Sequence, residues 1–218
     1  MSSSRVGVAL SKRLSKIKSY YENERHVWDI GCDHGDLGLS FSDNQSVEAI
    51  HLVDPSSKVI DQLQIRIKDS YITIPKINIK QIKGQKLTIE KQNNIIFIAG
   101  MGGKEIGEII QSLLPLIDSS SKIIISPHKN ILELRVLLNQ LPISLIDEDI
   151  VFENNQYYQL IVLRPDNSVS SSKVSLYGSL LWTKVHSENY RDHLLKYFVH
   201  HRGALSIGYV NYLKSLVF

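Results

Sequence analysis

The chain has 218 residues, of which 43% are hydrophobic and 22% charged, with one cysteine and a formal net charge of +3. This length accommodates one full-sized domain and an appendage, and the single cysteine excludes an internal disulfide framework and a zinc site built from cysteines. Because no apolar run reaches transmembrane length and the N-terminus lacks the apolar core of a signal peptide, we expect a cytoplasmic protein without a membrane partner.

The predicted elements alternate between strands and helices along most of the chain. In chain order, the pattern predicts a helix at 5–21, a strand at 26–30, a short helix at 37–41, a strand at 49–53, a helix at 56–69, strands at 76–82 and 94–99, a helix from 104, a strand at 122–125, a helix at 131–140, and strands at 143–151 and 157–163. Such alternation is typical of a mostly parallel α/β sheet, and the last two strands predict an antiparallel hairpin at its edge.

The C-terminal quarter of the chain has a different character. Residues 164–172 contain Ser, Pro and Asp, which is typical of a linker, and residues 174–217 form a helical pattern with breaks near Ser187 and Gly203. The sequence therefore predicts an α/β domain over 1–163 and a small helical appendage over 173–218.

A glycine-containing loop follows the first predicted strand. The strand places Asp29 immediately before Ile30 and Gly31, and a second glycine, Gly35, follows four residues later. The glycines allow the backbone to pass close to a ligand, but an acid at this point would repel the pyrophosphate of a dinucleotide. It suits a ligand that carries an ammonium and a sulfonium, so the loop predicts a site for S-adenosylmethionine. Asp29 would hold the amino end of this cofactor directly or through water.

A second acid ends the next predicted strand. Asp54 lies 25 residues after Asp29, and Ser56 can cap the helix that follows. A carboxylate in this place can accept both hydroxyl groups of a ribose, as in dinucleotide-binding folds. The alternative is that Asp54 is only a solvated or helix-capping acid.

Three glycines in four residues end the strand at 94–99. The turn Gly100-Met101-Gly102-Gly103 would lie beside the first strand, where the transferred methyl group meets its acceptor. A carbonyl of Ala99 or Gly100 could accept a proton of an exocyclic amine, and Met101 could pack on a flat base. The alternative is a tight turn with no further role.

No pair of a nucleophile and a base is evident, which suits methyl transfer because positioning supplies much of the rate. His34 could assist the reaction, although a structural hydrogen-bonding role is the main alternative, and Cys32 is expected to pack. The remaining histidines lack acid or cysteine companions at ligand spacing, so we expect no metal site.

The loop from Asp29 to His34, the stretch from Ala99 to Gly103, and the hairpin between Glu148 and Tyr158 together resemble the bacterial tRNA (adenine(22)-N1)-methyltransferase family. The resemblance extends from about Leu14 to Leu163. It implies a Rossmann-like class I methyltransferase domain, S-adenosylmethionine as cofactor, and methylation of N1 of an adenine in the D-arm of tRNA.

Carried over by position, the resemblance assigns individual roles. The cofactor would be lined by Asp29, Gly31, Asp33, His34 and Asp54, and the target base would face Gly100, Met101 and Gly102. The expected catalytic residues are therefore Asp29, Gly100, Met101 and Gly102, and the loop glycine Gly35 and the strand-end Ala99 are added to the cofactor site from their own positions. The sequence departs from the family pattern at Gly35-Asp36, at 84–87 and at Ser126-Pro127-His128, where the family has Ala-Tyr, Gly-Asp-Gly-Leu and Gln-Pro-Asn. Gln85 could therefore supply the contact to the cofactor adenine.

The charge distribution indicates the class of partner. Residues 1–25 contain six Lys or Arg against two acids, and residues 164–218 contain seven against three, so an acidic middle lies between two basic ends. Such ends favour a polyanion over a small molecule, although solvated helix faces are the alternative. The expected tRNA contacts are Lys12, Arg13, Lys16, Arg191 and Lys196, with Met101 at the base.

Two further interpretations remain open at this stage. One is a methyltransferase of another RNA or of a small molecule, and the other is an RNA-binding module without catalysis. An NAD-dependent oxidoreductase is disfavoured because Gly31, Gly35 and Gly38 do not form the G-x-G-x-x-G pattern. The sequence leaves the oligomeric state open, with a monomer as the working expectation.

Overall fold

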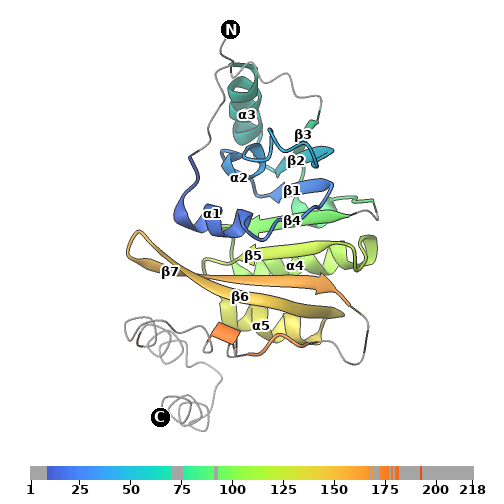
Figure 1. Ribbon diagram of the computed structural model, residues 1–218, viewed down its shortest axis with the longest axis vertical. Helices are drawn as coiled ribbons and strands as arrows, with labels where there is room; N and C mark the ends of the chain where they lie inside the picture. Colours follow the sequence, from blue (N-terminus) through green and yellow to red (C-terminus); the bar gives the residue numbers. More distant parts are fainter. Residues whose placement is uncertain are drawn as a thin grey trace.

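The structure is a computed structural model that describes residues 9–69, 76–90, 93–166, 168, 172–176, 178, 180–181 and 192. Within these residues the chain forms one seven-stranded sheet in the order β3-β2-β1-β4-β5-β7-β6 (Figure 1). The five strands from β3 to β5 are parallel, and β7 pairs antiparallel with both β5 and β6. The predicted α/β fold with a terminal antiparallel hairpin is confirmed.

The strands follow the predicted apolar runs closely. They are β1 His26–Ile30, β2 Ala49–Asp54, β3 Ile77–Gln81, β4 Asn94–Ala99, β5 Lys122–Ser126, β6 Ile143–Glu153 and β7 Gln156–Pro165. Every residue of β5 is buried, as expected for a parallel strand covered on both faces. The hairpin is longer than predicted and closes at Asn154 and Asn155, which both have positive φ as a two-residue hairpin loop requires.

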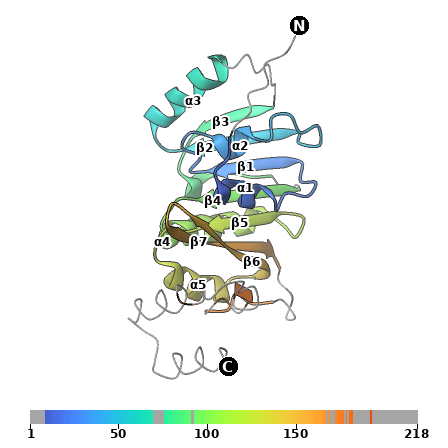
Figure 2. The same cartoon turned by 60° about the vertical axis from the view of Figure 1, so that its left-hand side comes forward.

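Helices cover both faces of the sheet, as Figures 1 and 2 show. On one face, Ile17, Leu39 and Leu63 bring α1 Lys12–Lys18, α2 Asp36–Leu39 and α3 Ser57–Asp69 into one apolar cluster. On the other face, α4 Gly103–Leu113 and α5 Ile131–Gln140 pack through a second cluster that includes Ile106 and Leu134. The result is a three-layer arrangement with an apolar core on each side of the sheet.

The first helix is shorter than the sequence pattern predicts. α1 begins after Ser11, whose side-chain oxygen accepts a hydrogen bond from the backbone of Leu14 at 3.3 Å, and it ends at Lys18 rather than near residue 21. A serine N-cap satisfies a free backbone donor and defines the start of the helix. Residues 5–8 of the predicted helix, and most of the predicted C-terminal appendage, lie outside the described residues.

The strand order reverses between β1 and β4, which are neighbours in the sheet although β2 and β3 lie between them in sequence. Asp29 and Ile30 of β1 pair in register with Phe97 and Ile98 of β4, so the loops that follow these strands emerge side by side. In open α/β sheets this position, beyond the carboxyl ends of the strands, is where ligands bind.

Candidate active site

A cavity of about 500 Å³ opens at this switch point. Its walls come from α1, from the loops after β1, β2 and β4, and from the loop after β5. The lining includes Asp29, Gly31, Cys32, Asp33, His34, Asp36, Asp54, Ala99, Gly100 and Met101, together with Arg13, Leu14, Leu37, Pro55, Glu105 and His128. The structure therefore brings the predicted acids and the glycine turn to one place.

Asp29 is buried at the base of this cavity. One of its carboxylate oxygens, Oδ2, accepts a hydrogen bond from the backbone N–H of Gly38 at 2.9 Å, which connects the end of β1 to α2. Burial raises the pKa of Asp29 to about 7, although the hydrogen bond from Gly38 lowers it, and the nearby carboxylates of Asp36 and Asp54 raise it further. A cationic ligand would relieve this buried negative charge.

Gly38 is the residue that allows this contact. A Cβ at Gly38 would lie 2.4 Å from a methyl carbon of Leu52 and 3.2 Å from Oδ2 of Asp29. From the sequence, Asp29 is expected to bind the cofactor and to take part in catalysis. The structure adds that the same carboxylate holds the glycine loop in place.

Asp54 lies at the carboxyl end of β2, next to the end of β1. Its Oδ1 accepts a hydrogen bond from the backbone N–H of Ser56 at 2.9 Å. The side-chain oxygen of Ser56 accepts in turn from the backbone N–H of Val59 at 3.4 Å and so caps the start of α3. The carboxylate is half-buried and contributes to the cavity wall. This position is compatible with both the ribose role and the capping role predicted from sequence.

Asp33 and His34 occupy the outer rim of the loop. Their side chains are 72% and 70% exposed and lie 3.6 Å apart, and Asp33 has a positive φ of 46°. Such exposure favours a rim contact over a buried catalytic role for His34. Cys32 is buried, and burial together with the charges of Asp29 and Asp54 raises the pKa of its thiol, so it remains protonated and packs.

The Gly-Met-Gly-Gly turn is held between two loops. The backbone N–H of Gly100 donates to the carbonyl of Ser126 at 3.1 Å, and the carbonyl of Met101 accepts from the backbone N–H of His128 at 3.0 Å. Met101 extends over Gly31, where an added Cβ would lie 2.7 Å from its Cε. Gly31, with φ of 73°, is therefore required both by its backbone conformation and by the close approach of Met101.

The remaining predicted cofactor residues occupy different surroundings. Ala99 lines the cavity at the switch point, whereas Gly35 does not: it adopts the left-handed conformation that precedes α2, and an added Cβ would lie 2.7 Å from Leu63 in the core. Gln85 lies instead in a neighbouring cavity of about 860 Å³ that also contains Gly100, Met101 and Gly102, and its side chain donates to Glu108 at 3.3 Å. The glycine turn thus separates two adjoining spaces.

The basic residues of α1 are only partly available to a partner. Lys16 forms an ion pair with Asp149 at 2.7 Å, and Arg13 contacts His128 and Tyr158 at the cavity mouth. Lys12 is exposed. Arg191 and Lys196 lie outside the described residues.

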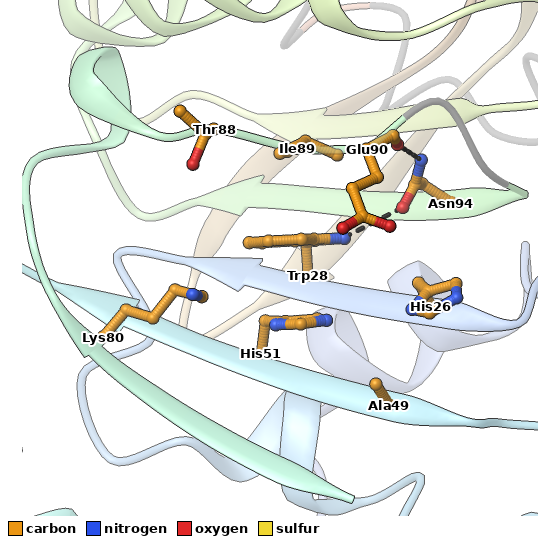
Figure 3. Close-up of a pocket in the computed structure, with 9 residues that line it drawn as sticks. All are labelled: His26, Trp28, Ala49, His51, Lys80, Thr88, Ile89, Glu90 and Asn94. Carbon is orange, nitrogen blue, oxygen red and sulfur yellow. Dashed lines mark hydrogen bonds between the residues drawn. The ribbon is translucent and has the colours of Figure 1, made fainter.

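A second cavity, which the sequence did not predict, lies on the other face of the sheet toward the amino ends of the strands. It encloses about 490 Å³ and shares no lining residue with the first cavity. We call that first cavity the acidic cavity because Asp29, Asp33, Asp36, Asp54 and Glu105 line it. Figure 3 shows Trp28 between the segment around Ile89 and the ring of His51, on which it stacks at 3.7 Å. The connection from β3 to β4 contains the short turn η1 Gly84–Lys86, and no α-helix is present in its described part to fill this space.

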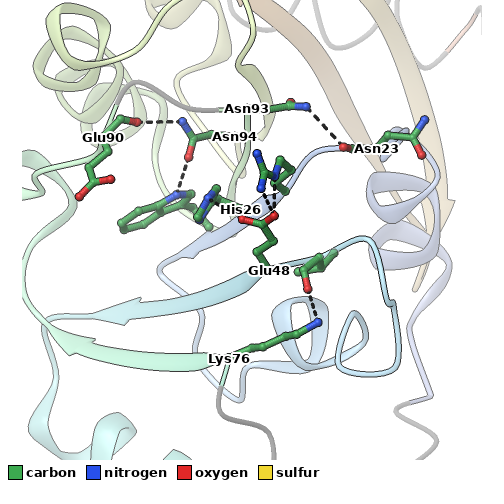
Figure 4. A network of polar contacts seen from close by, with 10 residues as sticks. Asn23, His26, Glu48, Lys76, Glu90, Asn93 and Asn94 are labelled. Atoms are coloured by element: carbon green, nitrogen blue, oxygen red, sulfur yellow. Dashed lines mark hydrogen bonds and ion pairs between the residues drawn. The ribbon is translucent and has the colours of Figure 1, made fainter.

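Polar contacts connect the segments around the second cavity. Trp28 donates its indole N–H to Asn94 at 3.0 Å, and Asn94 in turn donates to the carbonyl of Glu90 at 3.2 Å. Figure 4 shows these contacts together with Lys76, which donates to the backbone of Val47 at 2.6 Å. These hydrogen bonds join neighbouring segments of the sheet, and we assign them a structural and not a catalytic role.

Neither a metal site nor a membrane span is found in the described part of the chain. No group of three or more His, Cys, Asp or Glu side chains there could hold a metal ion. No helix among the same residues is long and apolar enough to cross a bilayer.

Comparison with known proteins identifies the domain. Residues 10–161 match the model of the family described as a methyltransferase domain, which covers more than half of the chain. The chain belongs to this family. The matched range contains the whole acidic cavity and the sheet that forms it.

Individual methyltransferases resemble this member of the family over most of its length. The tRNA (adenine(22)-N(1))-methyltransferase of Bacillus subtilis is 25% identical over 173 residues, which cover 79% of this chain and 72% of that protein. The crystal structure of the B. subtilis tRNA methyltransferase TrmK has a TM-score of 0.76 at 22% identity, covering 96% and 95% of the two chains. M. capricolum TrmK, in complex with S-adenosyl-homocysteine, has a TM-score of 0.69 at 18% identity, covering 94% and 93%.

Proposed function

We propose that this methyltransferase uses S-adenosylmethionine to methylate N1 of an adenine in the D-arm of tRNA. The observation that carries the proposal is the cavity in which the buried Asp29 and the strand-end Asp54 lie beside the Gly100–Gly103 turn. The names of the B. subtilis relative and the bound cofactor product of M. capricolum TrmK support the same reaction. A tRNA substrate would locate the activity in the cytoplasm.

The lining fits the cofactor by charge and by shape. S-adenosylmethionine carries an ammonium and a sulfonium, and five carboxylates contribute to the cavity wall, which are those of Asp29, Asp33, Asp36, Asp54 and Glu105. Asp29 would bind the amino end, Asp54 would accept from the ribose hydroxyls, and the glycine loop would allow close backbone approach. Leu37, Pro55 and Met101 would provide apolar contacts.

The proposed chemistry requires positioning more than acid–base assistance. When bound, S-adenosylmethionine supplies an electrophilic methyl group on a sulfonium. The lone pair of adenine N1 would form the new C–N bond to this methyl group, and the electron pair of the broken S–C bond would stay on sulfur. Since N1 carries no proton, the protein needs no general base, and its tasks are to align the two groups and to tolerate the positive charge on the base. The acidic lining would stabilise this charge.

The test combines cofactor binding with product mapping. Asp54→Ala should weaken S-adenosylmethionine binding by roughly 1–3 kcal/mol in calorimetry, the cost of losing hydrogen bonds to a charged group. Asp61→Ala, on the exposed side of α3, is the matched control and should bind normally.

With total tRNA and labelled cofactor, the native protein should leave a methyl group that blocks Watson–Crick pairing and stops reverse transcriptase in the D-arm. Labelling of another base or of a small molecule would identify a methyltransferase of different substrate. Cofactor binding without any transfer to tRNA would instead support a binding module.

A further inference from the structure

Three side chains from distant parts of the sequence meet at the mouth of the acidic cavity. They are Arg13 of α1, His128 of the loop after β5, and Tyr158 of β7, and we name them the mouth cluster. The guanidinium carbon of Arg13 lies 4.6 Å from the centre of the Tyr158 ring, and an Arg13 Nη1 contacts Nε2 of His128. The rings of His128 and Tyr158 are 5.6 Å apart and tilted by 50°.

The backbone of the first helix holds this cluster in place. The N–H groups of Lys12 and Arg13 donate to Oε1 of Glu153 at 2.6 and 3.4 Å, which attaches the start of α1 to the end of β6. Lys16 pairs with Asp149 one turn later along the helix. Because the helix is fixed to the hairpin at two points, Arg13 is positioned over the cavity mouth instead of extending freely into solvent.

The contact with Arg13 determines the state of His128. A guanidinium can only donate hydrogen bonds, so Nε2 of His128 must accept, and the imidazole is neutral with its proton on Nδ1. Partial burial and the charge of Arg13 both lower the pKa of His128. The neutral ring retains one N–H donor for another partner.

The mouth cluster adjoins the turn at which the acceptor is expected. His128 lines both the acidic cavity and the neighbouring cavity beside Gly102. Its Cε1 is 3.9 Å from the point that a Cβ of Gly100 would occupy, and its backbone N–H binds the carbonyl of Met101. His128 remains exposed in this position despite its contacts with Arg13 and Tyr158.

The donors of Arg13 are incompletely used by the protein. Its Nε is buried and has no hydrogen-bond partner among the described residues. A guanidinium plane, a phenol ring and an imidazole N–H together are the groups with which proteins hold an unstacked base.

We propose that the mouth cluster forms the part of the acceptor site that binds the purine base. This inference rests on the proposed function above. The acceptor base stacks on the face of the Arg13 guanidinium opposite the Tyr158 ring, and the Nδ1–H of His128 donates to N7, an acceptor on the far side of the purine from N1. N1 then stays free for the methyl group. A neutral His128 also avoids placing a second positive charge beside the base as it becomes cationic.

Two variants test the role of the mouth cluster directly. Tyr158→Leu removes the ring that holds the Arg13 guanidinium in its stacking position and should lower kcat/KM for tRNA about tenfold, the range found for loss of base stacking. His128→Phe keeps a ring but removes the donor and should lower kcat/KM roughly 3- to 10-fold. His128→Asn restores a donor and should recover part of this loss. His26→Gln, at the amino end of β1, is the control and should behave like the native protein.

Affinity for S-adenosyl-homocysteine, measured by calorimetry on the same proteins, separates the possible failures. The proposal expects unchanged affinity in both test variants. Equal loss of affinity and activity would assign the cluster to the cofactor pocket and overturn the proposal. If the native protein methylates tRNA and both variants keep its kcat/KM, the proposal is overturned as well. If the native protein does not methylate tRNA although it binds S-adenosyl-homocysteine, the proposed function fails first, and that result is distinct from the other two.

The pH profile provides a readout that a merely structural role would not change. In the native protein, protonation of His128 would break the contact with Arg13 and remove the neutral donor, so activity should decline at acidic pH. His128→Asn should lose this part of the decline while it retains any contribution from Asp29. An identical acidic limb in both proteins would contradict the role assigned to His128.

Discussion

At the scale of single residues, the acidic cavity combines two demands on the same side chain. Asp29 must be buried to lie under the ligand, yet burial makes its charge costly and raises its pKa to about 7. Its hydrogen bond to the backbone of Gly38 offsets only part of this cost. The protein therefore carries a destabilised carboxylate in the place where a cationic ligand would be bound.

Asp29→Asn should consequently stabilise the protein and weaken cofactor binding. The pKa of Asp29 is higher in the folded protein than in the unfolded chain, so its ionisation disfavours folding, and stability falls as the pH rises from about 4 to about 7. At pH 8 the variant should gain roughly 1–3 kcal/mol in the free energy of unfolding, measured by urea titration, and the gain should shrink toward pH 4.

The exposed neighbour provides a control for this prediction. Asp33→Asn changes a side chain that is 72% exposed, and asparagine tolerates the positive φ at this position. Its stability should therefore be unchanged at either pH. A stability gain in Asp29→Asn that does not depend on pH would show that charge burial is not the cause.

At the scale of elements, the Gly-Met-Gly-Gly turn joins β4 to α4 and also fixes α4 against α5. An added Cβ at Gly103 would lie 2.2 Å from the carbonyl oxygen of Asn130, a backbone atom that cannot move aside easily. At Gly102 the nearest atom is Cε of Lys129, at 3.3 Å, and a flexible side chain can adjust. Two adjacent glycines thus have different reasons for being small.

Gly103→Ala should therefore destabilise the fold by roughly 1–3 kcal/mol or more, the cost of forcing atoms into a packed contact. Gly102→Ala should change stability by less than about 1 kcal/mol, because its φ of −73° is ordinary. Denaturant unfolding of the pair measures both. Equal stability of the two variants would contradict the packing of α4 on the Asn130 loop.

A buried ion pair joins α5 to the hairpin. Arg135 and Glu148 are both fully buried, with Nη1 and Oε1 2.5 Å apart. Arg135 also donates to the carbonyl of Ser175 at 2.7 Å and to the side chain of Gln159 at 3.2 Å. This one side chain therefore links α5, both hairpin strands and the segment that follows the sheet.

Removing only Arg135 should be costly, because Glu148 would remain buried without its cation. Burial already raises the pKa of Glu148 while Arg135 lowers it. Arg135→Met should cost about 3–5 kcal/mol, and the double variant Arg135→Met, Glu148→Leu should recover much of that loss. A double-mutant cycle on urea unfolding measures the coupling. Additive losses would show that the pair does not act as a unit.

At the scale of the whole molecule, the charges are divided between an acidic cavity and basic ends. The acidic lining suits a cationic cofactor, and Arg13 of the N-terminal helix lines the same cavity. Since Lys16 pairs with Asp149 while Lys12 is exposed, the two lysines should contribute differently to tRNA binding.

Lys12→Gln should flatten the slope of log affinity against log salt for tRNA by roughly 0.7–0.9, the contribution of one phosphate contact. Lys16→Gln should leave that slope unchanged because its charge is already neutralised within the protein. Filter binding across a salt series distinguishes the two. Equal slopes in Lys12→Gln and the native protein would indicate that the start of α1 does not contact the nucleic acid.

The sequence by itself determined the order of the elements and the position of the ligand edge. Runs such as Asn94–Ala99 are short and apolar at nearly every position, which is typical of a strand buried on both faces, and glycines and acids mark where these strands end. These signals are local in the chain, so the sheet, the terminal hairpin and the positions of Asp29 and Asp54 at the ends of two strands could be predicted without coordinates.

Only the tertiary structure decided which side chains from distant segments meet. Arg13 lies 115 residues before His128 in the sequence, and α5 and β6 lie between His128 and Tyr158. No periodic pattern connects these three residues. The second cavity is likewise invisible in sequence, because it results from a crossover whose described residues contain no α-helix. Likewise, the pKa of Asp29 depends on burial by the folded chain, because only packing removes a carboxylate from water.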